Sequence, residues 1–89
     1  MNPLPPRLEW AASFGRRVHR RRTELGLTLS ELGAAVGSHR QSVWRWEHGE
    51  QLPDAYDLLR LARALRCTVW RLTDAPLPPL LIKPSNQAE

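Results

Sequence analysis

The sequence predicts an all-α fold of five helices, and three observations favour it. No stretch alternates apolar and polar residues for long enough to form a convincing strand, whereas several stretches place apolar residues three and four positions apart. Pro53 is the only proline between residues 7 and 75, so most of that span is free to be helical. With 89 residues, the chain has room for one domain around a single hydrophobic core.

The first helix is expected from about Ala11 or Ser13 to Leu25. Gly26 follows, and we expect it to end the helix in the left-handed conformation. Apolar residues form a stripe along one face of this helix. The stripe consists of Phe14, Val18 and Leu25. Five arginines lie on its other faces, so this helix should carry much of the positive charge of the molecule.

The next two helices are short and close together. Thr28 and Glu31 have the spacing of a capping box, in which each side chain binds the backbone N–H of the other residue, so a helix is expected over residues 29–36. Gly37 ends it in the left-handed conformation that glycine adopts without a Cβ penalty. A third helix follows over residues 40–47 or 40–48.

Two further helices follow the turn that contains Pro53. Asp54 is placed to cap the fourth helix, and Thr68 to cap a last short helix that ends near Thr73. The apolar residues of the fourth helix form a broad pattern, from which we expect it to be largely buried: Tyr56, Leu58, Leu59, Leu61, Ala62 and Leu65.

The prolines also predict the domain boundaries. We expect residues 1–10 to be a flexible, proline-rich N-terminus, residues 11–74 to be the folded domain, and residues 75–89 to be a proline-rich tail. The tail contains Leu77, Leu80, Leu81 and Ile82, which are too apolar for a purely solvated segment. It is therefore expected to dock on something.

Charge and composition narrow the function classes. The net charge is +4, and the excess lies in residues 1–49, which carry eight Arg and four Glu. Nearly all the cations are arginine, whose planar fork suits phosphate groups and guanine edges, so a polyanionic partner is favoured. No spacing suggests an activated nucleophile, paired carboxylates or a metal site, so no enzyme activity, cofactor or metal is expected. The lone cysteine, Cys67, fits a reducing cytoplasm, and no apolar run approaches the length of a membrane span.

Two short helices joined by a tight glycine-containing turn are typical of a helix-turn-helix unit, whose second helix lies in the major groove of DNA. Gly33 would allow these two helices to approach closely. A helical wheel at about 100° per residue puts Val43, Trp46 and Glu47 on one face of residues 40–48. The opposite face collects Arg40, Gln41, Trp44, Arg45 and His48. Arginine and glutamine there suit guanine and adenine edges, the alternative being a solvated polar face.

With these residues in place, the chain resembles the phage-repressor-like (XRE, or lambda repressor-like) helix-turn-helix family over residues 13–73. The resemblance implies a five-helix domain that binds operator DNA, usually as a homodimer. It is carried by Phe14-Gly15-Arg16-Arg17-Val18, Arg22, Gly26-Leu27-Thr28, Glu31-Leu32, Gly37, Val43, Trp46-Glu47, Gly49, Pro53 and Leu65.

The resemblance also implies roles for individual residues. The base-reading positions of the family fall on Arg40, Gln41, Trp44 and Arg45, and an ion pair between its first and third helices falls on Arg22 and Glu47. The first helix crosses the DNA backbone in this fold, which adds its arginines to the phosphate-contacting candidates. These candidates are Arg16, Arg17, Arg20, Arg21, Thr28, His39, Ser42 and His48.

Three positions depart from the family pattern. Leu29 stands where a glutamine commonly contacts a phosphate, and Gly33 replaces a common alanine. Trp44 occupies a position usually held by a small or polar residue. Its indole must insert in the groove, lie along a sugar edge or contact another protein, and the sequence leaves these alternatives open.

The expected function is that of a cytoplasmic, nucleoid-associated transcriptional regulator, most simply a repressor that binds a pseudo-palindromic double-stranded operator as a homodimer. The alternative is an antitoxin or adaptor whose main partner is a protein and whose DNA binding serves autoregulation. The apolar residues 76–82 and Trp70 motivate that alternative.

Overall fold

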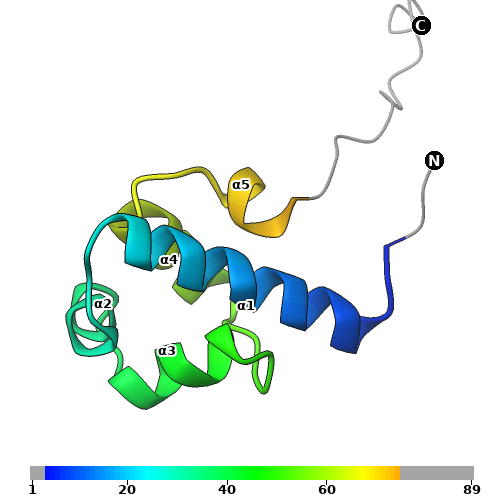
Figure 1. Ribbon diagram of the computed structural model, residues 1–89, viewed down its shortest axis with the longest axis horizontal. Coiled ribbons are helices and arrows are strands. Elements are labelled where there is room, and N and C mark those ends of the chain that lie inside the picture. Colours follow the sequence, from blue (N-terminus) through cyan, green and yellow to red (C-terminus); the bar gives the residue numbers. More distant parts are fainter. Residues whose placement is uncertain (1–3, 75–89) are drawn as a thin grey trace, which may run out of the picture.

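The structure is a computed structural model that describes residues 4–74, and within that range it is all helix and loop. Five helices follow one another along the chain (Figure 1). They are α1 (Arg7–Glu24), α2 (Leu29–Ala35), α3 (Arg40–Glu47), α4 (Ala55–Ala64) and α5 (Val69–Thr73). The all-α, five-helix prediction is confirmed. The apolar tail of residues 75–89 lies outside the described residues.

The expected start of the first helix was wrong, because α1 begins at Arg7 and takes in residues that were assigned to a flexible N-terminus. Pro6 occupies the N-cap with φ −53° and ψ 150°, and its carbonyl accepts from the N–H of Trp10 at 2.9 Å. Proline suits a helix start because its fixed φ is compatible with the helix and its missing N–H is not needed there. The indole of Trp10 then stacks on Phe14, with ring centroids 5.5 Å apart.

The three predicted capping residues are confirmed. The Thr28 hydroxyl accepts from the N–H of Glu31 at 3.0 Å, and the Glu31 carboxylate accepts from the N–H of Thr28 at 2.8 Å, which completes the capping box. Asp54 accepts from the N–H of Asp57, and Thr68 accepts from the N–H of Arg71. Each bond satisfies an amide that would otherwise lack a partner at a helix start.

The hydrophobic core draws on all five helices. Its buried members are Phe14, Val18, Leu32, Val36, Val43, Trp46, Leu61, Ala62, Leu65 and Leu72. Of the apolar pattern expected to be largely buried, Leu61, Ala62 and Leu65 are buried, whereas Tyr56 is 67% and Leu59 54% exposed. At 100° per residue these two side chains fall outside the arc shared by Leu61 and Leu65. Leu25, expected on the stripe of α1, also lies at the surface, because the helix has already ended there.

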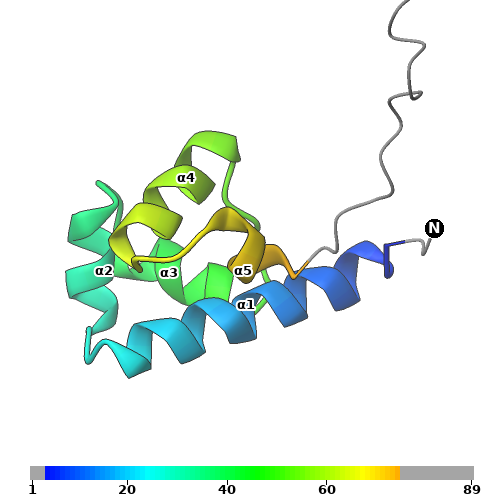
Figure 2. The same ribbon diagram turned by 90° about the horizontal axis from the view of Figure 1, so that it is seen from above.

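Two glycines allow α3 to pack closely against its neighbours. A Cβ on Gly33 of α2 would lie 2.9 Å from the carbonyl carbon of His39, just before α3. A Cβ on Gly15 of α1 would lie 2.3 Å from the carbonyl oxygen of Glu47, at the end of α3. The close approach expected at Gly33 is thus confirmed. Figure 2 shows α1 running along one side of the molecule, with α5 packed against it.

Candidate nucleic-acid interface

The two faces of α3 separate as the helical wheel predicts. Val43 and Trp46 are buried in the core, and the side chain of Glu47 is only 2% exposed. The opposite face is exposed and consists of Arg40, Gln41, Trp44, Arg45 and His48. The buried face fixes the helix on the domain, which leaves the polar and aromatic face free to meet a ligand.

The four expected base-reading residues come together in space. Arg40, Gln41, Trp44 and Arg45 line a hollow of about 930 Å³, together with His39 and Glu50. Within residues 4–74, neither Arg40 nor Arg45 forms an ion pair. Their guanidinium groups therefore keep donors available for an acceptor outside the protein.

Trp44 is stacked on His48, one helical turn further along the same stripe of α3. The two ring centroids are 3.8 Å apart and the ring planes differ by 19°. The imidazole Nδ1 lies 2.8 Å from the backbone carbonyl oxygen of Trp44. His48 was expected to contact a phosphate, but in the structure it also fixes the neighbouring indole.

A buried ion pair ties the end of α3 to α1. Arg22 donates from Nε to Glu47 Oε2 at 2.6 Å and from Nη2 to Oε1 at 3.0 Å. Its Nη1 donates to the carbonyl of Leu27 at 2.8 Å, which adds the loop after α1 to the network. The hydrogen bond to Glu47 raises the pKa of Arg22, against an opposing effect of burial. The pair therefore fixes the position of α3 relative to α1.

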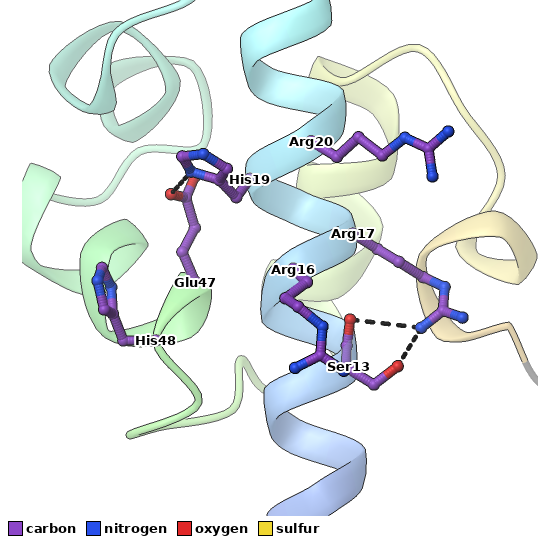
Figure 3. Close-up of a pocket in the computed structure, with 7 residues that line it drawn as sticks. All are labelled: Ser13, Arg16, Arg17, His19, Arg20, Glu47 and His48. Carbon is purple, nitrogen blue, oxygen red and sulfur yellow. Dashed lines mark hydrogen bonds and ion pairs between the residues drawn. The ribbon is translucent and has the colours of Figure 1, made fainter.

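His19 is a third member of this cluster that the sequence analysis did not place there. Its Nδ1 lies 2.9 Å from Glu47 Oε1 (Figure 3). The signal was its spacing, since His19 is three residues before Arg22 and therefore shares its helix face. The groove of about 640 Å³ beside this cluster is lined by Ser13, Arg16, Arg17, His19, Arg20, Glu47 and His48.

The four arginines of α1 that were expected to contact phosphates divide into two groups. Arg17 forms an ion pair with Asp74 at 2.6 Å and also bonds Ser13. Arg21 donates to the carbonyl oxygens of Leu65 at 2.8 Å and of Arg66 at 3.3 Å. These two guanidinium groups link α1 to the segment containing α5.

The second group comprises Arg16 and Arg20, which remain exposed. The side chain of Arg20 is 82% exposed and makes only a 3.5 Å contact with Glu24, four residues later on the same helix. Arg16 has no ion pair within the described part of the chain. Both are open to a phosphate, whereas Arg17 and Arg21 would first have to leave their protein partners.

The remaining phosphate-contacting candidates lie near the starts of α2 and α3. His39 is exposed at the N-cap of α3, and its side chain makes no capping bond. Ser42 is half-buried on α3, and the hydroxyl of Thr28 accepts within the capping box. Leu29, which replaces the common glutamine of the family, packs against the core.

Other types of site find little support in residues 4–74. No three His, Cys, Asp or Glu side chains there are grouped closely enough to hold a metal ion. Burial raises the pKa of the Cys67 thiol, which opposes the thiolate form that a reactive cysteine needs. None of the helices described is long and apolar enough to cross a membrane.

Comparison with known proteins gives consistent matches. A family model described as "Helix-turn-helix" (HTH_3) matches residues 18–69, more than half of the chain. The repressor protein C2 of Salmonella phage P22 is 35% identical over 55 residues, which cover 62% of this chain and 26% of the repressor. The chain thus spans about a quarter of the length of that relative.

Solved structures extend the comparison to three dimensions. The crystal structure of the P22 c2 repressor with a synthetic operator is 34% identical, with a TM-score of 0.65 and coverage of 66% of this chain and 89% of that one. A restriction-modification controller protein from Aeromonas hydrophila is 31% identical, with a TM-score of 0.68 and coverage of 70% and 94% respectively. In the P22 structure the similar domain is bound to DNA.

Proposed function

Because this chain belongs to the helix-turn-helix family of phage-repressor-like domains, we propose that it binds double-stranded DNA through α3 and acts as a transcriptional repressor. The observation that carries the proposal is the exposed face of α3, where Arg40 and Arg45 have no ion-pair partner among the described residues. The buried face of the same helix holds it in place through Val43, Trp46 and Glu47. A rigid helix with free guanidinium groups on one side is suited to the major groove.

The side chains of this face suit direct readout of bases. Arginine donates two hydrogen bonds to O6 and N7 of guanine, and glutamine bonds N6 and N7 of adenine. We therefore assign guanine recognition to Arg40 and Arg45, and adenine recognition to Gln41. All three are exposed and lie around the same hollow, so they can meet neighbouring base pairs.

Phosphate contacts would orient α3 without reading sequence. We assign them to Arg16, Arg20, His39, Ser42 and His48, and to the start of α2 at Thr28. Arg17 is assigned instead to holding the end of α5 against α1 through Asp74, and Arg21 to holding the α4–α5 connection through Leu65 and Arg66, because their guanidinium groups are already bonded there. This narrows the four phosphate-contacting candidates of α1 to Arg16 and Arg20.

The repressor role is proposed by analogy with the P22 repressor, and the dimer is proposed because the family resemblance implies it. The P22 repressor is seen with a synthetic operator. By analogy, we propose that two copies of this chain bind a pseudo-palindromic site in the DNA of the nucleoid, in the cytoplasm. In helix-turn-helix dimers the half-sites lie one turn apart, about 34 to 36 Å. Occupancy of such a site over a promoter would exclude RNA polymerase. No catalytic role is assigned to the chain.

A second candidate function is that of an antitoxin or adaptor with a protein partner. The observation that favours it is Trp70, which is 43% exposed on α5, the last helix before residues 76–82. Deleting residues 76–89 separates the roles of that segment. Loss of self-association in sedimentation would assign it to the dimer, whereas an unchanged dimer that no longer retains a co-purifying protein would assign it to the adaptor.

The DNA-binding proposal is tested by selection from random duplexes, followed by titration of the enriched duplex and of a random one at physiological salt. We expect the enriched duplex to bind at least about 10³-fold more tightly, as is typical of specific sites. Arg45→Ala should lose most of that preference. Arg63→Ala removes the same charge from an exposed position of α4 and should keep it. Equal binding of both duplexes by the unmodified protein would refute the proposal.

A further inference from the structure

The stack of Trp44 on His48 is not explained by the general family pattern, in which this position of α3 is small or polar. The two rings lie nearly parallel at 3.8 Å between centroids, on the exposed stripe of α3. Trp44 nevertheless remains 40% exposed, so it is neither a core residue nor fully covered by its neighbour. The arrangement leaves a defined part of the indole open.

His48 is held by its backbone contact as well as by the stack. A carbonyl oxygen only accepts hydrogen bonds, so Nδ1 of His48 must carry the hydrogen and donate it to the carbonyl of Trp44 at 2.8 Å. The imidazole is thus anchored one turn beyond Trp44 and lies flat against the ring. It restricts the indole to orientations that keep this contact.

The covered face of the indole limits what Trp44 can do in a groove. Insertion between two base pairs requires both faces of a ring, and His48 already occupies one of them. The remaining exposed surface borders the hollow that Arg40, Gln41 and Arg45 also line. Trp44 is therefore placed to meet the edge of a base pair beside these polar residues, without separating the stacked bases.

In the major groove, the apolar group available to such a surface is the 5-methyl group of a pyrimidine, which thymine carries. Resting on the proposed function, we propose that Trp44 reads a pyrimidine 5-methyl group and that His48 is the positioning residue that orients the indole for this contact. The same methyl group is present in 5-methylcytosine. The polar neighbours would then read the adjoining guanine and adenine edges.

The test replaces each thymine of the enriched duplex in turn by deoxyuridine, which removes only the methyl group. At one position in each half-site, deoxyuridine should weaken binding by about fourfold, the value of one buried methyl group. Trp44→Ala should bind the thymine and deoxyuridine duplexes equally at that position. Gln41→Ala, the matched control, should bind more weakly and yet keep the fourfold ratio.

Two variants separate positioning by His48 from a merely structural role. His48→Phe retains a flat ring and loses the hydrogen-bond donor, so it should keep most of the fourfold ratio. His48→Ala removes the ring, and its ratio should fall towards one while circular dichroism and the unfolding midpoint show an intact fold. A full ratio in His48→Ala would overturn the positioning role.

A second arm distinguishes the source of the methyl group. If the reading position holds cytosine in the enriched duplex, 5-methylcytosine should tighten binding by the unmodified protein and not by Trp44→Ala. Suppose that a duplex is enriched, but that neither deoxyuridine nor 5-methylcytosine changes the affinity in a way that Trp44→Ala abolishes. The methyl-reading inference is then overturned. Failure to enrich any duplex would instead refute the proposed function itself.

Discussion

At the scale of single residues, the buried carboxylate of Glu47 determines how α3 is held. Its side chain is 2% exposed and accepts two bonds from Arg22 and one contact from His19. Family resemblance pointed to the partnership with Arg22, and the wheel put Glu47 on the inner face. His19 was missed because a surface histidine is the ordinary interpretation of an isolated imidazole on a basic helix.

Glu47→Ala should be strongly destabilising, because it leaves the guanidinium of Arg22 with 11% exposure and no counter-charge. We expect a loss of about 3 to 5 kcal/mol in the free energy of unfolding, measured by urea denaturation. Glu24→Ala is the matched control. Its ion pairs with Arg20 and Arg21 lie at the surface, where such pairs contribute about 0 to 1 kcal/mol. Equal losses in the two variants would contradict this account.

Cys67 should react slowly in the folded protein. Burial raises its pKa, so the thiolate fraction near neutral pH is smaller than in the unfolded chain. Because the thiol pKa is higher in the folded than in the unfolded protein, Cys67 stabilises the fold at pH values below its unfolded pKa. This stabilisation is lost as the pH rises through its folded pKa. Alkylation by iodoacetamide at neutral pH should therefore accelerate when urea unfolds the protein. If urea leaves the alkylation rate unchanged, the Cys67 thiol is already fully reactive in the folded protein, contrary to this prediction.

At the scale of helices, the sequence predicted three N-terminal caps correctly, but not the start of α1 or the exposed residues of α4. The caps at Thr28, Asp54 and Thr68 were predictable because each depends on a side chain only three residues from the amide it binds. The start of α1 was missed because Pro6 was interpreted as a break, although proline also begins helices. The exposure of Tyr56 and Leu59 depends on which neighbours cover α4, and that is a property of tertiary packing.

Gly15 and Gly33 should resist replacement by alanine, although alanine favours helix by about 1 kcal/mol at an unobstructed position. At Gly15 the new methyl group would lie 2.3 Å from a backbone oxygen of α3, and at Gly33 2.9 Å from a backbone carbon before α3. We expect net losses of about 1 to 3 kcal/mol, larger for Gly15→Ala, in thermal or urea unfolding.

Ala34→Gly provides the control for these glycine variants. Ala34 is exposed on α2, so this change should cost only the helix propensity, about 1 kcal/mol. A stabilised Gly33→Ala variant would show that α2 and α3 are not in close contact. The comparison also checks the position of α3, because both glycines adjoin its ends.

At the scale of the whole molecule, the positive charge has two roles that the sequence could not separate. Arg16, Arg17, Arg20 and Arg21 were all predicted alike as phosphate-contacting candidates. Their division depends on Asp74, which pairs with Arg17, and on Leu65, which accepts from Arg21. Both partners are more than 40 residues away along the chain and come to lie beside α1. The all-α class and the family were predictable because they depend on local patterns, and both are confirmed.

Salt dependence should reveal this division. Arg20→Ala should weaken binding to all duplexes alike and reduce the slope of log affinity against log salt by about 0.9 for each protomer bound, or about 1.8 for a dimer that loses one phosphate contact per protomer. Arg21→Ala should leave the slope nearly unchanged and instead lower the unfolding midpoint, because it removes bonds to the backbone of residues 65 and 66. The reverse pattern would contradict the assignment of these two residues.

The central claim is that the free face of α3 lies in the major groove, and its most direct test is the coupling of Arg40 to one guanine. In the enriched duplex, each guanine is replaced in turn by 7-deazaguanine, which removes the N7 acceptor, and affinities are measured for the unmodified protein and for Arg40→Ala. One replacement should weaken binding by the unmodified protein roughly 10-fold and leave Arg40→Ala unaffected. If every replacement weakens both proteins equally, Arg40 does not read a base and the account is wrong.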